Sequence, residues 1–109
     1  MSNLGTQYLF LNQTTDANST AFAIPYSNKV AVIKVWGTFD GANVKFQTLA
    51  PGTSASPVWI DVPDDTGNII TFVLDAQRAL KYLIQNEQLR AVLSNAGAST
   101  SITASVEMY

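Results

Sequence analysis

The segment from residue 30 to residue 62 is the feature that most constrains the fold. It contains three short runs of apolar or alternating residues, and turn formers such as Gly, Pro and Asp separate them. Runs of this length that are rich in Val, Ile, Phe and Trp are typical of β-strands. Residues 30–36 are mostly apolar on both faces of such a strand, which indicates a central strand, and Asp40-Gly41 is typical of a hairpin turn. The segment therefore predicts strands packed around a core.

Short runs of the same kind continue along the rest of the chain. We expect brief strands at residues 7–11, 21–24 and 69–74. Residues 101–108 alternate in a way that points four apolar side chains inward, namely Ile102, Ala104, Val106 and Met108. A length of 109 residues is typical of one domain. The pattern predicts an all-β, single-domain β-sandwich or jelly roll of about 7–8 short antiparallel strands.

Residues 75–93 are compatible with two structures. A helix would place several aliphatic residues on one face: Ala76, Leu80 and Leu83 or Ile84. A β-hairpin would use residues 80–85 and 89–94 as strands, with a turn at residues 86–87. We favour the strands because strands and turns flank the segment on both sides, but residues 75–87 leave strand and helix open.

The first 20 residues are polar apart from one apolar stripe, so we treat residues 1–20 separately from a sandwich domain at residues 21–109. They form either an arm that docks on a partner by strand addition or a plain first strand followed by a polar loop. Tyrosine is well suited to interfaces because it combines an apolar ring with a polar tip. The residues that we expect at a partner interface are Tyr8, Leu9, Phe10, Leu11 and Tyr26.

Composition excludes several kinds of chemistry. The chain has no histidine and no cysteine, so the Ser–His–Asp and Cys–His catalytic arrangements are impossible, and disulfides and thiolate metal ligands are too. We expect no catalytic residues and no cofactor. Charged residues make up 13% of the chain against about 25% in a typical domain, which gives a weak field for attracting nucleic acid. No apolar run is long enough to span a membrane, and no signal peptide is evident.

One acidic cluster is a candidate cation-binding site. It consists of Asp61, Asp64 and Asp65, with Asn68 nearby. Hard cations such as Ca²⁺ take oxygen ligands from loops of this composition. However, the spacing differs from that of the known calcium loop, Pro63 interrupts it, and Asp and Gly are also what a turn requires. We interpret the cluster as a turn and expect no metal site. A pair of catalytic carboxylates for glycoside hydrolysis has no other support in the sequence.

The aromatic residues allow two interpretations. Trp36 and Trp59, together with several tyrosines, could form a platform on which sugar rings stack. The alternative is that both tryptophans belong to the core, and we favour it because both lie in apolar strands. Arg90 lies between Leu89 and Ala91, so we expect it on the solvated face of a sheet or paired with a carboxylate.

Three motifs suggest a family. They are Trp-Gly-Thr-Phe-Asp-Gly-Ala-Asn-Val-Lys-Phe-Gln, then Trp-Ile-Asp-Val, then Leu-Arg-Ala-Val before Gly-Ala-Ser-Thr-Ser. This pattern resembles small virion proteins of tailed bacteriophages over roughly residues 30–106. The matching positions are Gly37, Phe39, Gly41, Ala42, Trp59, Asp61, Val62, Leu89, Arg90, Ala91 and Val92. They are positions that maintain the fold, and residues 75–82 depart from the pattern because they are richer in helix formers.

The resemblance implies a capsid decoration protein of the cement or staple type. Such a protein is a non-enzymatic virion structural protein. It clamps neighbouring major capsid subunits on the outer shell, contacts further copies of itself, and assembles with the capsid in the host cytoplasm. The alternative is a carbohydrate-binding β-sandwich of a phage tail or receptor-binding component. Either way, we expect the interaction residues outside residues 30–62, in the N-terminal segment and the loops.

Overall fold

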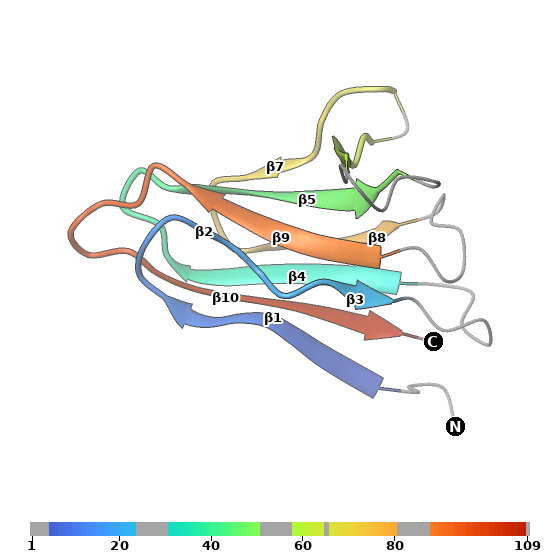
Figure 1. The fold of residues 1–109 in the computed structure, drawn as a ribbon. Coiled ribbons are helices and arrows are strands. Elements are labelled where there is room, and N and C mark those ends of the chain that lie inside the picture. Colours follow the sequence, from blue (N-terminus) through green and yellow to red (C-terminus); the bar gives the residue numbers. More distant parts are fainter. Residues whose placement is uncertain (1–4, 24–30, 51–57, 65, 81–87, 109) are drawn as a thin grey trace.

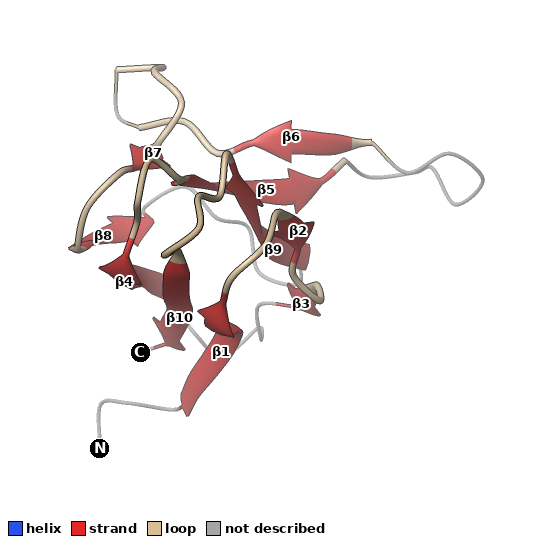
Figure 2. Cartoon of the chain, turned by 90° about the vertical axis from the view of Figure 1, so that its left-hand side faces the viewer, coloured by secondary structure: helices blue, strands red, loops and turns tan. Residues whose placement is uncertain are grey.

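Two antiparallel β-sheets packed against each other form the protein. The computed structural model describes residues 5–23, 31–50, 58–64, 66–80 and 88–108. Figures 1 and 2 show the strands in two layers from directions at right angles, and the described residues form strands, turns and loops without a helix. This confirms the predicted all-β sandwich. No helix among the described residues is long and apolar enough to cross a membrane.

The first sheet has four strands in the order β1-β10-β4-β8. They are β1 (Gly5–Gln13), β10 (Ser101–Met108), β4 (Ala31–Thr38) and β8 (Ala76–Leu80). The central strand β10 points Ile102, Ala104, Val106 and Met108 into the core, as the alternation predicts. On its other face Thr103 and Ser105 are also buried, because β1 and β4 flank them on both sides.

The second sheet is built around two long strands, β5 (Asn43–Leu49) and β9 (Gln88–Ser94). Short strands form its edges: β2 (Ala17–Asn18) and β3 (Phe22–Ala23) pair with β9, while β6 (Trp59–Asp61) and β7 (Thr71–Phe72) pair with β5. Alternate residues of the long strands are fully buried, namely Val44, Phe46, Leu89, Ala91 and Leu93, and Thr48 at the end of the same face of β5 is half-buried. The predicted alternation of β5 is therefore confirmed.

The core lies between the two sheets. Phe46 packs edge-on against Phe72, with ring centroids 5.9 Å apart, and this contact ties the edge strand β7 to the centre of the second sheet. Ile33 and Val35 of β4 fill the opposite side of the core and are fully buried. Nearly all of this burial comes from aliphatic and phenylalanine side chains.

The turn at Asp40-Gly41 does not make a hairpin, contrary to our prediction. The turn itself forms: the Ala42 N–H donates to the Phe39 carbonyl at 2.9 Å, and Asp40 and Gly41 have φ angles of 47° and 85°. However, β4 pairs with β10 and β8, whereas β5 pairs with β9. The turn therefore carries the chain from one sheet to the other. Turn residues specify a local reversal, but pairing with distant strands decides which sheet each strand joins.

In the ambiguous segment at residues 75–93, residues 76–80 and 88–93 are strand, which confirms the choice of strands over helix there. Among the described residues β9 pairs with β2, β3 and β5, and not with a preceding strand of a hairpin. The predicted strand and turn at residues 81–87 lie outside the described residues. The predicted strand at residues 69–74 is strand only at Thr71–Phe72.

Candidate functional site

The apolar stripe of the N-terminal segment is divided between the surface and the core. Residues 5–13 form the edge strand β1, which fits the first-strand alternative. The register shifts between Tyr8 and Phe10, and such a bulge turns neighbouring side chains to opposite faces. Tyr8 and Leu11 are 52% and 68% exposed, whereas Phe10 is 4% exposed and packs in the core with Leu9 against it. Phe10 is thus not available to a partner, and Tyr26 lies outside the described residues.

Both tryptophans lie on outer faces of the sandwich, so their assignment to the core is wrong. Trp36 is 38% exposed, because it alternates with the inward-pointing Val35 of the same strand. Trp59 is half-buried and pairs with Leu49, which places it on the outer face of the second sheet. The apolar composition of a strand indicates that the strand is largely covered by its neighbours. It does not indicate to which face of the sheet a tryptophan side chain points.

A cluster of polar and aromatic side chains covers the outer face of the second sheet. We call it the outer-face cluster: Lys45, Gln47, Trp59, Asp61 and Arg90. The Gln47 amide donates to Asp61 Oδ1 at 2.8 Å, and Lys45 Nζ approaches Asp61 Oδ2 at 3.4 Å. Arg90 Nε and Nη2 both donate to Gln47 Oε1, at 2.9 and 2.7 Å. The Arg90 guanidinium also stacks on the Trp59 ring, 4.1 Å from its centroid.

Strand register explains why these side chains meet. Gln47 lies directly opposite Asp61 on β6 and opposite Arg90 on β9, so one residue of β5 joins the strands on both sides of it. Cross-strand neighbours on one face are close enough to bond. Arg90 is therefore on the solvated face, as one of our two alternatives predicted, but its partners are an amide and an indole ring.

The charges of this cluster are set by its own hydrogen bonds. The Gln47 hydrogen bond, with the nearby Lys45 ammonium, lowers the pKa of Asp61 below its ordinary value of 3.8 despite partial burial. Partial burial lowers the pKa of Arg90, but a guanidinium stays charged at neutral pH. The cluster thus presents an ionised carboxylate held by Lys45 and Gln47, with Arg90 and the Trp59 ring on the other side of Gln47.

The acidic loop is a turn, as we interpreted it. Asp64 Oδ1 accepts hydrogen bonds from Thr66 N and Oγ1, both at 2.8 Å, and from Asn68 N at 3.0 Å. These bonds lower the pKa of the Asp64 carboxyl, while Asp61 is directed at the side chains of β5. A glycosidase needs one carboxyl with a raised pKa as the acid, and here both values are lowered. Asp65 lies outside the described residues. Among the described residues, no three acidic side chains lie close enough together to hold a metal ion.

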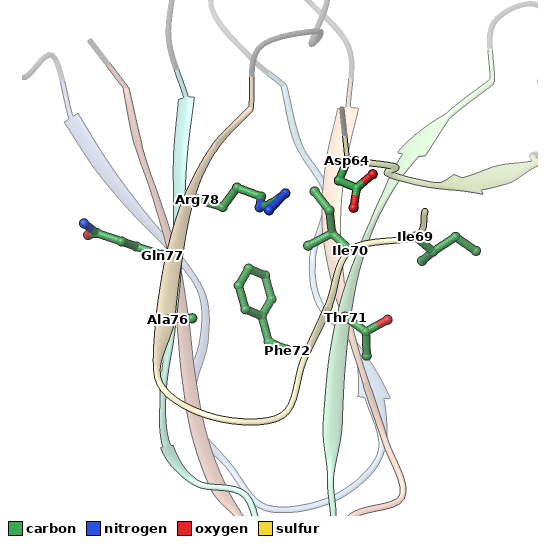
Figure 3. Close-up of a pocket in the computed structure, with 8 residues that line it drawn as sticks. All are labelled: Asp64, Ile69, Ile70, Thr71, Phe72, Ala76, Gln77 and Arg78. Atoms are coloured by element: carbon green, nitrogen blue, oxygen red, sulfur yellow. The ribbon is translucent and has the colours of Figure 1, made fainter. Parts of the chain in front are cut away.

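A cavity opens between the two sheets on the side where β7 and β8 form neighbouring edges. Its volume is about 370 Å³, and it is lined by Asp64, Ile69, Ile70, Thr71, Phe72, Ala76, Gln77 and Arg78. Figure 3 shows Phe72, Ile70 and Arg78 pointing into the space between the strands, while Gln77 and Ile69 point away from it. The turn after β7 closes one end, where Asp75 Oδ1 accepts a hydrogen bond from Gly37 N at 3.0 Å.

Exposed aliphatic residues are concentrated in and around the edge strands β6 and β7. Among the described residues, five of the eight large exposed apolar side chains lie between residues 58 and 74. We call them the apolar rim: Val58, Ile60, Ile69, Val73 and Leu74, which are 51–63% exposed. Our sequence reasoning missed this surface because it treated residues 69–74 only as an apolar strand. The available signal was a run of apolar residues with no polar residue on alternate positions except Thr71.

Comparisons of the chain with protein-family models, with curated proteins and with solved structures gave no match.

Proposed function

We propose that the protein is a non-enzymatic structural protein of a tailed-phage virion, a capsid decoration protein that clamps neighbouring major capsid subunits on the outer shell. The observation that carries this proposal is the apolar rim. Monomeric proteins seldom leave a group of large aliphatic side chains at the surface, and such groups mark protein interfaces. The motifs at residues 36–47, 59–62 and 89–101 add the resemblance to phage virion proteins.

The size of the rim bears on how such a clamp holds. Full burial of an aliphatic side chain contributes about 1.5–3 kcal/mol, so five half-exposed side chains contribute roughly 5 kcal/mol on docking. The loss of translational and rotational freedom on association costs a comparable amount, about 4 kcal/mol or more. One rim contact is therefore weak. We infer that each copy gains affinity by touching more than one neighbour, either capsid subunits or other copies of itself.

The test uses capsids assembled from the major capsid protein of the phage whose genome carries this gene. Purified protein is mixed with compact and with expanded capsids, and bound protein is measured after sedimentation. We expect saturable binding to expanded capsids. The double substitution Val73→Ser/Leu74→Ser should abolish this binding, because it removes two aliphatic side chains of the apolar rim. Both side chains are more than 60% exposed, so their replacement leaves the core intact.

Leu11→Ser is the matched comparison, since it removes an equally exposed aliphatic residue from β1. Loss of binding with Leu11→Ser alone would move the interface to the stripe that our sequence analysis named. Failure of the unmodified protein to bind either capsid form would refute the decoration role.

A second candidate function is carbohydrate binding, as on a tail or receptor-binding component. It is favoured by one observation, the position of Trp36 and Trp59 on outer faces, because exposed indole rings can stack on sugars. Trp36→Phe leaves Trp59 as the remaining tryptophan. If sugars stack on Trp59, its fluorescence should change across a glycan panel in this variant. An unchanged spectrum with every glycan would exclude the outer-face cluster as a sugar site.

A further inference from the structure

The cavity between β7 and β8 combines an apolar floor with one free cation. Phe72 and Ile70 form the floor, and each is 7% exposed, while Ala76 is half-buried and small. Arg78 stands at the mouth with an exposed side chain. Within the described part of the chain, no carboxylate lies within ion-pair distance of Arg78. Asp64 Oδ1 accepts three hydrogen bonds within the turn, and the pKa of Asp64 is lowered by these bonds and also by the nearby Arg78 charge.

The strand that carries Arg78 is an edge. In the order β1-β10-β4-β8, β8 pairs with β4, and no other strand of the described residues lies on its far side. Half of the backbone N–H and C=O groups of an edge strand face away from the sheet and are ready to pair with another extended chain. Arg78 pairs with the fully buried Ile33 across the β4–β8 ladder. Its side chain therefore projects toward the space between the sheets and not toward the outer face.

These features define what an added strand would need. A residue opposite Arg78 would point to the same side, into the mouth of the cavity, and an acidic side chain there would form a cross-strand ion pair. A residue two positions away would lie opposite Ala76, whose small side chain leaves the cavity space free. A volume of about 370 Å³ is at the lower end of the range for binding pockets and suits a short segment.

We propose that the β7–β8 side accepts an extended segment of a partner protein, which adds to β8 as a strand. The segment carries an aliphatic residue and, two positions along, a carboxylate: the aliphatic side chain fills the cavity over Phe72 and the carboxylate pairs with Arg78. The exposed Val73 and Leu74 at the closed end and Ile69 on the rim extend the contact. This inference deepens the proposed function, and it rests on it only in taking the partner to be a protein.

Arg78 has an alternative role that the test must separate. An inward-pointing charge on an edge strand is also a way in which proteins prevent unwanted strand pairing. In that case, removal of the charge would favour pairing between copies of this chain. The two roles predict opposite effects of the same substitution on binding, so one variant distinguishes them.

The probe is a fluorescein-labelled peptide, Thr-Leu-Thr-Glu-Thr, with Thr-Leu-Thr-Gln-Thr as its uncharged counterpart. Binding is measured by anisotropy, and amide exchange of residues 76–80 reports strand addition. We expect the acidic peptide to bind at least about tenfold more tightly than its counterpart and to slow exchange in β8. Arg78→Gln should remove that preference. Arg90→Gln makes the same change in net charge on the outer face of the second sheet and should retain it.

Two outcomes would overturn the inference. Equal affinity for both peptides would show that Arg78 does not select a carboxylate. Unchanged peptide binding by Arg78→Gln, together with new dimers in sedimentation velocity, would show that Arg78 only guards the edge. The result is separable from the proposed function: capsid binding that persists in Arg78→Gln would place the docking contact elsewhere, while peptide binding without capsid binding would refute the decoration role alone.

Discussion

Gly37 is the position where one added methyl group should do most damage. Its φ angle is +132°, in a region that side chains rarely adopt. It lies opposite Ile102 in the β4–β10 ladder, and an added Cβ would collide with the Ser101 carbonyl oxygen and lie 3.3 Å from the Ile102 Cα. All of these obstacles are backbone atoms of the central strand, so they cannot move aside without disturbing the pairing.

The expected magnitude follows from two terms. A residue other than glycine in this conformation costs about 1–3 kcal/mol. Displacing the β10 backbone at the collision adds a further cost, which we take as about 1–2 kcal/mol, of the order of an over-packed core site. We therefore expect Gly37→Ala to reduce the free energy of unfolding by roughly 2–5 kcal/mol, a large part of the about 5–15 kcal/mol of a typical domain.

Gly41→Ala is the matched control. Gly41 also has a positive φ angle, +85°, but an added Cβ meets nothing within 4 Å. That variant should lose about 1 kcal/mol from backbone strain alone. Urea unfolding followed by tryptophan fluorescence measures both variants, and the difference between them isolates the collision with β10. Equal losses in the two variants, or a loss below about 1 kcal/mol in Gly37→Ala, would refute the close approach of β4 and β10 at this point.

Three further predictions test the core and the outer-face cluster. Phe46→Ala should lower the free energy of unfolding by about 3–5 kcal/mol in urea titration, because it leaves a cavity beneath the second sheet. The folded-state pKa of Asp61 lies below its ordinary value of 3.8, so the Asp61 charge stabilises the fold above about pH 4. This contribution is lost as the pH falls through the folded-state pKa. Asp61→Asn should therefore flatten the loss of stability in acid, and an unchanged dependence of stability on pH would contradict the Gln47 contact. Arg90→Ala should uncover the Trp59 ring and increase its quenching by acrylamide, measured in a Trp36→Phe background; unchanged quenching would contradict the stacking.

The sequence patterns predict local structure well and sheet membership poorly. Alternation correctly identified the inward faces of β5 and β10, and the flanking strands and turns favoured strands at residues 89–94. It could not show that Asp40-Gly41 joins two sheets, because that depends on β4 pairing with β10, which is more than 60 residues away in the chain. A turn signal constrains a few φ and ψ angles, whereas the choice of partner strand is decided by packing across the whole domain.

The surfaces were harder to predict than the core. Trp36 and Trp59 are the largest side chains of the protein, yet strand register alone decides to which face of the sheet each one points. A shift of the register by one residue would turn each tryptophan to the opposite face. The bulge at residues 8–10 had the same effect on the N-terminal stripe and took Phe10 into the core. Arg90 shows what could be predicted: its place among apolar neighbours indicated the solvated face or a carboxylate partner, but no pattern pointed to Gln47 as its partner.

The two proposed functions make different demands on the same surface, and the aliphatic residues separate them. Sugars are bound by flat aromatic faces and hydrogen-bonding groups, so a carbohydrate site can account for Trp59 and Arg90 but leaves Val73 and Leu74 exposed without a purpose. A protein partner that docks along β6 and the β7–β8 side accounts for both. Trp59 and Ile60 follow each other on the edge strand β6 and point to opposite faces, so a partner that clasps this edge from both sides contacts Trp59 as well as Ile60. For this reason Trp59→Ala should weaken capsid binding as well, whereas a role in sugar binding alone predicts that capsid binding is unaffected.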